Sequence, residues 1–165
     1  MSHIRILIPS QTLELLDDED RLMRRYLVST SSRGVGEKNG SFRTPRGRHI
    51  IRAKIGHGQP ANAVFMRRRP TGEIYSRELA ERFPERDWML TRILWLSGSE
   101  PGFNRLGDVD TMRRFIYLHG SPDTAAMGQP GSIGCVRMHN RDIIELFDLV
   151  PVGISVDILE HQSPA

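Results

Sequence analysis

The chain holds one cysteine, and the residues around it are of the kinds that carry acyl-transfer chemistry. Cys135 lies in the segment Gly-Ser-Ile-Gly-Cys-Val-Arg-Met-His-Asn (131–140), sixteen residues after His119. A thiol becomes a good nucleophile when a base or a positive charge favours the thiolate. A neutral imidazole can take that proton and later return it to a leaving amine. We therefore expect Cys135 to act as nucleophile and His119 as base.

Further residues of the same motif fit this chemistry. Gly134 permits a sharp turn before the cysteine, so the backbone N–H groups of Gly134 and Cys135 can hold the oxyanion of acyl transfer. Arg137 can bind a carboxylate through two parallel hydrogen bonds beside the reacting carbonyl. Ser132 and Asn140 are further candidates for substrate binding.

The same residues also allow simpler interpretations. Cys135 can be a small buried core residue, His119 a hydrogen-bonded residue at a strand end, and Arg137 the partner of a nearby acid. Cys135, His119 and His139 can also be read as zinc ligands, because thiolate and imidazole are usual zinc donors. The Cys-x3-His spacing is weak for a metal, and there is no second cysteine. We therefore predict no metal and no other cofactor.

Composition points to one globular domain. The chain has 165 residues, of which 38% are hydrophobic and 26% charged, enough to bury a core without metal or disulfide support. The balance of 23 basic and 20 acidic residues is only mildly basic. The arginine run at 67–69 is interpreted as a solvated loop rather than a nucleic-acid site, because aromatic residues are scarce and no binding motif surrounds it.

Alternating apolar and polar residues predict strands along much of the chain. They lie near residues 4–8, 13–15, 22–30, 49–55, 91–96, 114–118 and 154–158. The first three follow one another through polar turns and are expected to form a β-meander. The glycine- and proline-rich segment 31–47 is expected to be a loop.

Two short helices are also predicted. Ser76 can cap one that stops at a proline, and Asn140 can cap another that ends near Pro151. The irregular segment 58–90 is either a cap over the site or a peripheral insertion. The expected fold is thus one domain over residues 1–165, mostly β, with a curved sheet or sandwich and two or so short helices.

Taken together, the motifs resemble the L,D-transpeptidase catalytic domain family, also called YkuD. That family shows a His-Gly pair followed by Ser-His-Gly-Cys-x-Arg-Met, matched here by His119-Gly120 and by residues 132–138. Residues 44–47, Thr-Pro-Arg-Gly, resemble the family's Thr-Pro-x-Gly signature, and residues 151–158 resemble its closing strand. The resemblance spans nearly the whole chain and is least clear across the irregular segment.

The resemblance implies a cysteine acyl-enzyme that acts on peptidoglycan stem tetrapeptides. Cys135 would attack the carbonyl of the third, diamino-acid residue and release the terminal D-alanine. His119 would be the base, with the backbone carbonyl of Gly120 orienting its ring. The acyl group would then pass to water, leaving a tripeptide, or to an amine, forming a crosslink. The resemblance also implies acylation of Cys135 by carbapenems.

One residue departs from the family pattern. Ile133 occupies the position where the family usually carries histidine, and isoleucine can neither donate a hydrogen bond nor hold charge. In one interpretation Ile133 only packs under the loop, and turnover needs Cys135 and His119 alone. In the other the chain is a weakened, wall-peptide-binding module in which Arg137 holds a carboxylate. His139 is a nearby imidazole that could take the missing place.

The expected location favours hydrolysis over crosslinking. The chain shows no apolar run long enough for a signal-peptide core or a membrane span, so we expect it in the cytoplasm. There it would meet soluble muropeptides with water abundant, which favours L,D-carboxypeptidase action in murein recycling. A chain from which a leader had been removed would read the same, and would instead work in the periplasm or cell envelope.

Overall fold

The computed structural model describes residues 1–161 and consists mainly of strands. In chain order the strands are β1 (His3–Leu7), β2 (Thr12–Leu16), β3 (Leu22–Ser29), β4 (Gly47–Ile55), β5 (Ala63–Met66), β6 (Arg69–Ile74), β7 (Met89–Gly98), β8 (Tyr117–Ser121), β9 (Val136–His139) and β10 (Ser155–Leu159). The helices are α1 (Arg77–Arg82) and α2 (Asn140–Leu149), with a short 3₁₀ helix at Gly107–Val109. The expected mostly β fold with two short α-helices is confirmed.

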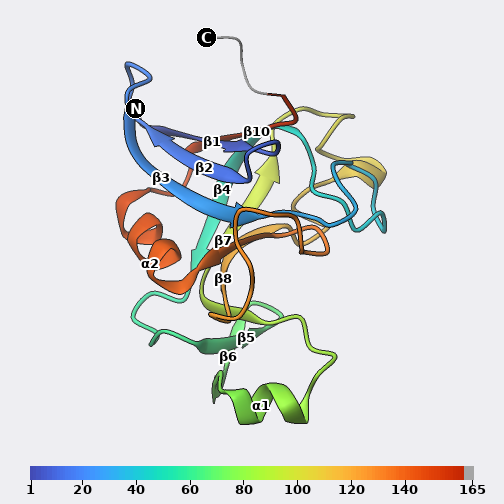
Figure 1. Ribbon diagram of the computed structural model, residues 1–165. Coiled ribbons are helices and arrows are strands. Elements are labelled where there is room, and N and C mark those ends of the chain that lie inside the picture. The colour runs from blue at the N-terminus through green and yellow to red at the C-terminus, as the bar shows by residue number, and fades with distance from the viewer. Residues whose placement is uncertain (162–165) are drawn as a thin grey trace.

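The strands form one sheet that curves until it closes on itself (Figure 1). The order is β4-β10-β1-β2-β3-β9-β8-β7-β5-β6, and β4 also pairs with β7. Eight strands therefore make a closed ring, from which β5 and β6 extend beside the start of β7. The antiparallel pairing of β1 with β2 and of β2 with β3 confirms the predicted meander.

The main hydrophobic core brings the ring together with α2. Apolar side chains from all eight strands of the ring form one cluster there with buried side chains of α2. Ile143, Leu146 and Phe147 are the core residues that lie within α2. These three positions recur at helical spacing, so one stripe of α2 is covered by the sheet.

The parallel pairing of β8 with β9 decides which side chains face this core. Leu118 is opposite Val136 in the register, and both are fully buried in the main core. His119 is opposite Arg137, one step further along. Because successive side chains of a strand point to opposite faces, His119 and Arg137 lie on the face away from the main core. Cys135, two residues before Arg137, belongs to that same face.

The two helices begin close to where the sequence predicts. Ser76 caps α1, and its side chain accepts a hydrogen bond from the Leu79 N–H at 3.1 Å. In α2 the cap position is His139, and Asn140 is the first helical residue, so the prediction of Asn140 as cap is wrong by one residue. The physical reason is that the Asn140 side chain is used elsewhere in the fold. Within residues 1–161, no helix is long and apolar enough to cross a membrane.

The segment 58–90 is more regular than its sequence suggests. It contains the β5–β6 hairpin and α1, and β5 pairs with β7 (Figure 1). The hairpin turns at Arg67 and Arg68, which have φ values of 49° and 65°. Such turns usually use asparagine or glycine. The two arginines at these positions therefore gave no signal of a turn in the sequence.

The strands around the cysteine motif also differ from expectation. The predicted strand at 114–118 is observed as β8 from Tyr117 to Ser121, and β9 was not predicted. Phe115 has a φ of 58°, which is outside the extended region and keeps the strand from starting earlier. β9 has only four residues, too short for alternation to stand out.

The core makes a testable prediction about stability. Leu13 on β2 is fully buried, whereas Leu22 on the neighbouring β3 is half exposed. Leu13→Ala should lower the free energy of unfolding by about 2–5 kcal/mol because it leaves a cavity in the core. The matched change Leu22→Ala should cost no more than about 0.5–1 kcal/mol. Urea unfolding followed by circular dichroism measures both, and equal losses would contradict this assignment of the core.

Candidate active site

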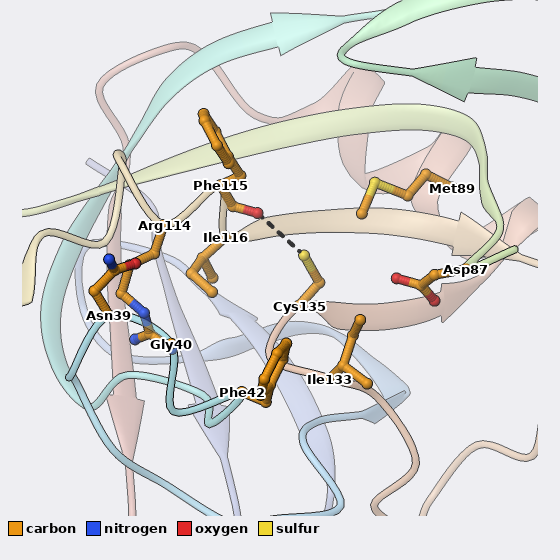
Figure 2. Close-up of a pocket in the computed structure, with 10 residues that line it drawn as sticks. All are labelled: Asn39, Gly40, Phe42, Asp87, Met89, Arg114, Phe115, Ile116, Ile133 and Cys135. Carbon is orange, nitrogen blue, oxygen red and sulfur yellow. Dashed lines mark hydrogen bonds between the residues drawn. The ribbon is translucent and has the colours of Figure 1, made fainter.

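Cys135 lies immediately before β9, and its thiol is nearly buried. Its Sγ accepts a hydrogen bond from the Tyr117 N–H at 3.3 Å. It also donates to the Phe115 carbonyl at 3.3 Å, the dashed line in Figure 2. Only 7% of the residue is exposed. Burial raises the pKa of the thiol to about 12, since a thiolate is poorly solvated there. The resting cysteine is therefore a neutral thiol.

His119, on β8, is buried completely and faces the same side as Cys135. Its Nδ1 lies 2.7 Å from the Gly120 carbonyl oxygen. A carbonyl can only accept, so Nδ1 carries the hydrogen and Nε2 keeps its lone pair. Burial lowers the pKa of the imidazole, which keeps the ring neutral. The Nε2 atom has no hydrogen-bond partner among residues 1–161 and can accept a proton.

The loop before the cysteine is fixed by two side chains. The Ser132 hydroxyl donates to the Cys135 carbonyl at 2.6 Å and accepts from the Gly134 N–H at 3.2 Å. Thr44, from the Thr-Pro-Arg-Gly segment, donates to the Gly134 carbonyl at 2.9 Å. Ser132 is thus buried inside the loop. One of the two expected oxyanion donors, the Gly134 N–H, is engaged within the loop, and the Cys135 N–H is the other.

Gly134 is at a position where glycine is required. Its φ is +135°, a conformation that residues with a side chain rarely adopt. A Cβ there would lie 3.3 Å from the Ile116 side chain and 3.5 Å from the Arg43 carbonyl. The glycine before the cysteine therefore serves both the turn and the close packing of the loop.

Arg137 is already occupied by groups of the protein. One nitrogen, Nη2, lies 3.0 Å from an oxygen of Asp87, and Nη1 donates to the Gly131 carbonyl at 2.9 Å. Arg137 thereby joins the segment before β7 to the loop that leads to Cys135. The bidentate contact with a substrate carboxylate, expected from the sequence, would have to displace Asp87.

Asp87 is anchored by its chain neighbours. Arg86 forms an ion pair with Glu73 at 2.9 Å, and the Trp88 ring packs edge-on against Tyr75 with centroids 5.1 Å apart. These contacts hold the irregular segment between α1 and β7 against the end of β6. The segment 58–90 thereby brings a carboxylate to the cysteine.

Asn140 does not line the cavity of Cys135. Its Nδ2 donates to the Asn62 side chain at 2.8 Å, and its Oδ1 accepts from the Thr91 hydroxyl at 2.7 Å. A Cβ added at Gly120 would collide with that same oxygen, so Asn140 packs directly against Gly120. It lines a separate cavity together with His139, so His139 does not stand in for the imidazole missing at position 133.

Cys135 lines a cavity of about 290 Å³, shown in Figure 2. The lining residues are Asn39, Gly40, Phe42, Asp87, Met89, Arg114, Phe115, Ile116, Ile133 and Cys135. Ile133 is half exposed at this cavity, so it does not pack beneath the loop. Asp87 and Met89 come from the segment between α1 and β7 and its junction with that strand, and form part of the wall.

The sequence did not single out Asp87 or Arg114 as site residues. Thr44 belonged to a recognised signature, but its bond to the Gly134 carbonyl joins residues far apart in the chain. Arg114 carries no local signal, because it is one of many arginines in the chain. These residues meet Cys135 only through the folded sheet.

The residues proposed as an alternative zinc set do not converge. Cys135 and His139 line different cavities. Within residues 1–161 there is no group of three or more His, Cys, Asp or Glu side chains arranged to hold a metal ion. The donor geometry therefore does not fit zinc bound by Cys135, His119 and His139 together.

Comparisons with known proteins agree on one family. The family described as L,D-transpeptidase catalytic domain (YkuD) matches residues 1–158. The candidate L,D-transpeptidase YkuD of Bacillus subtilis (strain 168) is 49% identical over 41 residues, which cover 25% of this chain and 25% of that protein. The match thus spans about a quarter of the relative's length.

Solved structures share the fold at low sequence identity. The L,D-transpeptidase of Xylanimonas cellulosilytica DSM 15894 has a TM-score of 0.59 and 19% identity, and the match covers 96% of this chain and 60% of that one. The transpeptidase LdtMt1, solved in complex with imipenem, has a TM-score of 0.57 and 16% identity, with 96% and 58% covered. At these identities the likeness shows the fold alone.

The charges beside Cys135 predict opposite effects on its reactivity. The Asp87 carboxylate raises the pKa of the thiol, and the Arg137 and Arg114 guanidiniums lower it. Asp87→Asn should therefore lower the thiol pKa and speed alkylation by iodoacetamide at pH 8, where the rate follows the thiolate fraction, by about tenfold per pKa unit. Arg137→Gln should slow it. Mass spectrometry of the labelled protein measures both rates, and changes in the same direction would indicate loop disruption instead.

Proposed function

Because this chain belongs to the L,D-transpeptidase catalytic domain (YkuD) family, we propose that it is a cysteine acyl-enzyme acting on peptidoglycan stem tetrapeptides. It cleaves the bond between the diamino acid and the terminal D-alanine. One observation carries the proposal: a thiol that lines a cavity shares a strand face with a buried, neutral histidine whose Nε2 has no partner within residues 1–161.

The proposed reaction uses this neutral pair. As the substrate carbonyl approaches, the thiol leaves the Phe115 carbonyl, His119 Nε2 takes its proton, and the sulfur attacks the carbonyl carbon. The oxyanion is held by loop N–H groups, with the Cys135 N–H as the expected donor. The imidazolium then protonates the D-alanine amine, which leaves, and the thioester remains on Cys135.

Hydrolysis of the thioester is proposed as the main outcome. His119, neutral again, takes a proton from water, which attacks the thioester. The C–S bond then breaks, the tripeptide leaves, and the imidazolium returns the proton to the Cys135 sulfur. The cavity that Cys135 lines is open to solvent, so water can reach the thioester without a second binding step. In the expected location soluble muropeptides are the substrate and water is the abundant acceptor. L,D-carboxypeptidase action is therefore favoured over crosslinking.

Two further parts of the proposal follow from the substrate. A hydrolase of soluble muropeptides would work in the cytoplasm during murein recycling, and cell fractionation with an antibody against the chain tests that location. The related fold of LdtMt1 was solved with imipenem, and we extend carbapenem acylation to Cys135 here. Intact-protein mass spectrometry would show the added mass.

A second function is favoured by a specific observation. The thiol has a pKa raised to about 12 and donates to the Phe115 carbonyl rather than to His119. Together with Ile133 in place of the family histidine, this arrangement also suits a wall-peptide-binding module without turnover. Such a module would bind the tetrapeptide and leave it intact.

One incubation separates the two functions. The purified protein should remove a single D-alanine from disaccharide tetrapeptide, as seen by mass spectrometry. Cys135→Ala should abolish the product because no thioester can form, and a chelator should leave it unchanged. An added amine acceptor should yield a minor transfer product only. Binding without any product would favour the module, and loss of product on chelation would favour a metal enzyme.

Ile133→His tests whether the departure from the family pattern limits the rate. Ile133 is half exposed at the cavity, so an imidazole there would add one solvent-accessible hydrogen bond. Such a bond is worth about 0.5–1.5 kcal/mol, so kcat should rise no more than about tenfold. A rise of a hundredfold or more would show that the natural chain is catalytically weakened. Ile133→Leu is the control for shape.

A further inference from the structure

Arg114 lines the cavity of Cys135 and differs from Arg137 in what surrounds it. Arg137 is paired with Asp87, whereas Arg114 has no carboxylate within 4 Å among residues 1–161. Burial lowers the pKa of Arg114, and the nearby Glu37 carboxylate raises it. Glu37 itself is in direct contact with Arg46, at 2.9 Å. Arg114 therefore brings to the cavity wall a positive charge that is in no direct ion pair within residues 1–161, since arginine stays protonated in proteins.

The guanidinium is held in place by the loop at 36–43. Its Nη1 donates to the Gly36 carbonyl at 3.2 Å, and its Nη2 donates to the Arg43 carbonyl at 2.6 Å and to the Ser41 hydroxyl at 3.3 Å. All three acceptors are uncharged. A guanidinium has five N–H donors, so two remain for a ligand. A side chain fixed in this way loses little conformational entropy when it binds.

We propose that Arg114 binds the terminal carboxylate of the substrate and so restricts cleavage to the last residue of the stem peptide. This inference rests on the proposed function. It moves the recognition of the carboxylate from Arg137, where the sequence motif placed it, to an arginine on another segment. A charged group that meets the free carboxylate distinguishes a peptide end from an internal peptide bond.

The opposite wall gives the substrate a direction. In Figure 2 Arg114 and Asp87 lie on either side of Cys135, and all three line the same cavity. A carboxylate is attracted to Arg114, whereas at the opposite wall Asp87 is paired with Arg137 and offers it no free positive charge. The D-alanine end therefore points toward Arg114, and the rest of the stem peptide leaves past Asp87, with the scissile carbonyl above the thiol.

The test compares two substrates on the unaltered protein. Tetrapeptide with a free carboxylate and the same tetrapeptide as a C-terminal amide differ only at the group that Arg114 is proposed to bind. The free acid should be cleaved with a kcat/KM about ten- to a hundredfold higher. This comparison needs no variant and does not depend on how a substitution affects folding.

Variants then assign that preference to Arg114. Arg114→Gln should lower kcat/KM for the acid much more than for the amide, so that the ratio of the two falls to about one, because only the acid loses its carboxylate contact. Arg114→Lys should keep part of the preference, because it retains the positive charge. Arg113→Gln, at the exposed neighbouring position, is the matched control and should keep the full preference.

The outcomes separate this inference from the function on which it rests. If the unaltered protein cleaves acid and amide equally well, Arg114 is not a carboxylate site and the proposed function stands. If Arg114→Gln lowers kcat/KM for both substrates by the same factor, Arg114 only supports the loop, and the inference is overturned. If neither substrate is cleaved by the unaltered protein, the proposed function fails and the inference fails with it.

Discussion

The parallel, in-register pairing of β8 with β9 is the constraint on which the site depends. It places Leu118 opposite Val136 in the main core, and one step along it places His119 opposite Arg137 on the other face. A slip by one residue would exchange the two faces, exposing the core residues and burying charge. The hydrophobic core therefore fixes the register, and the register brings Cys135 and His119 to one side.

The sheet face that carries Cys135 and His119 is covered in part by β5. Ala63 and Phe65 of β5 pack with Cys135 in a second hydrophobic cluster, and the histidine is buried completely. Burial has two opposed effects: it lowers the pKa of His119, which keeps the base neutral, and raises that of Cys135, which disfavours the thiolate. The Cys135 thiol therefore stays protonated in the free protein.

Local patterns predicted the elements and the motif but not the contacts between distant segments. The meander, the Ser76 cap and the Cys135–His119 region are encoded within short stretches. The β5–β6 turn was missed because its residues do not reveal a positive φ. The pairing of Arg137 with Asp87 joins residues fifty positions apart, and Arg114 reaches a loop more than seventy positions away. Contacts at such separations follow only from the closed sheet.

The charges around the cysteine explain how a buried thiol can still react. Arg114 and Arg137 carry two positive charges and Asp87 one negative charge, so these groups leave one positive charge when Cys135 and His119 are neutral. Proton transfer from the thiol to the imidazole moves charge without changing this total. In the proposed reaction, a bound carboxylate would neutralise the excess, and departure of D-alanine would restore it. The proposed thioester and its next oxyanion would then face a net positive site, which would stabilise the negative charge formed during hydrolysis.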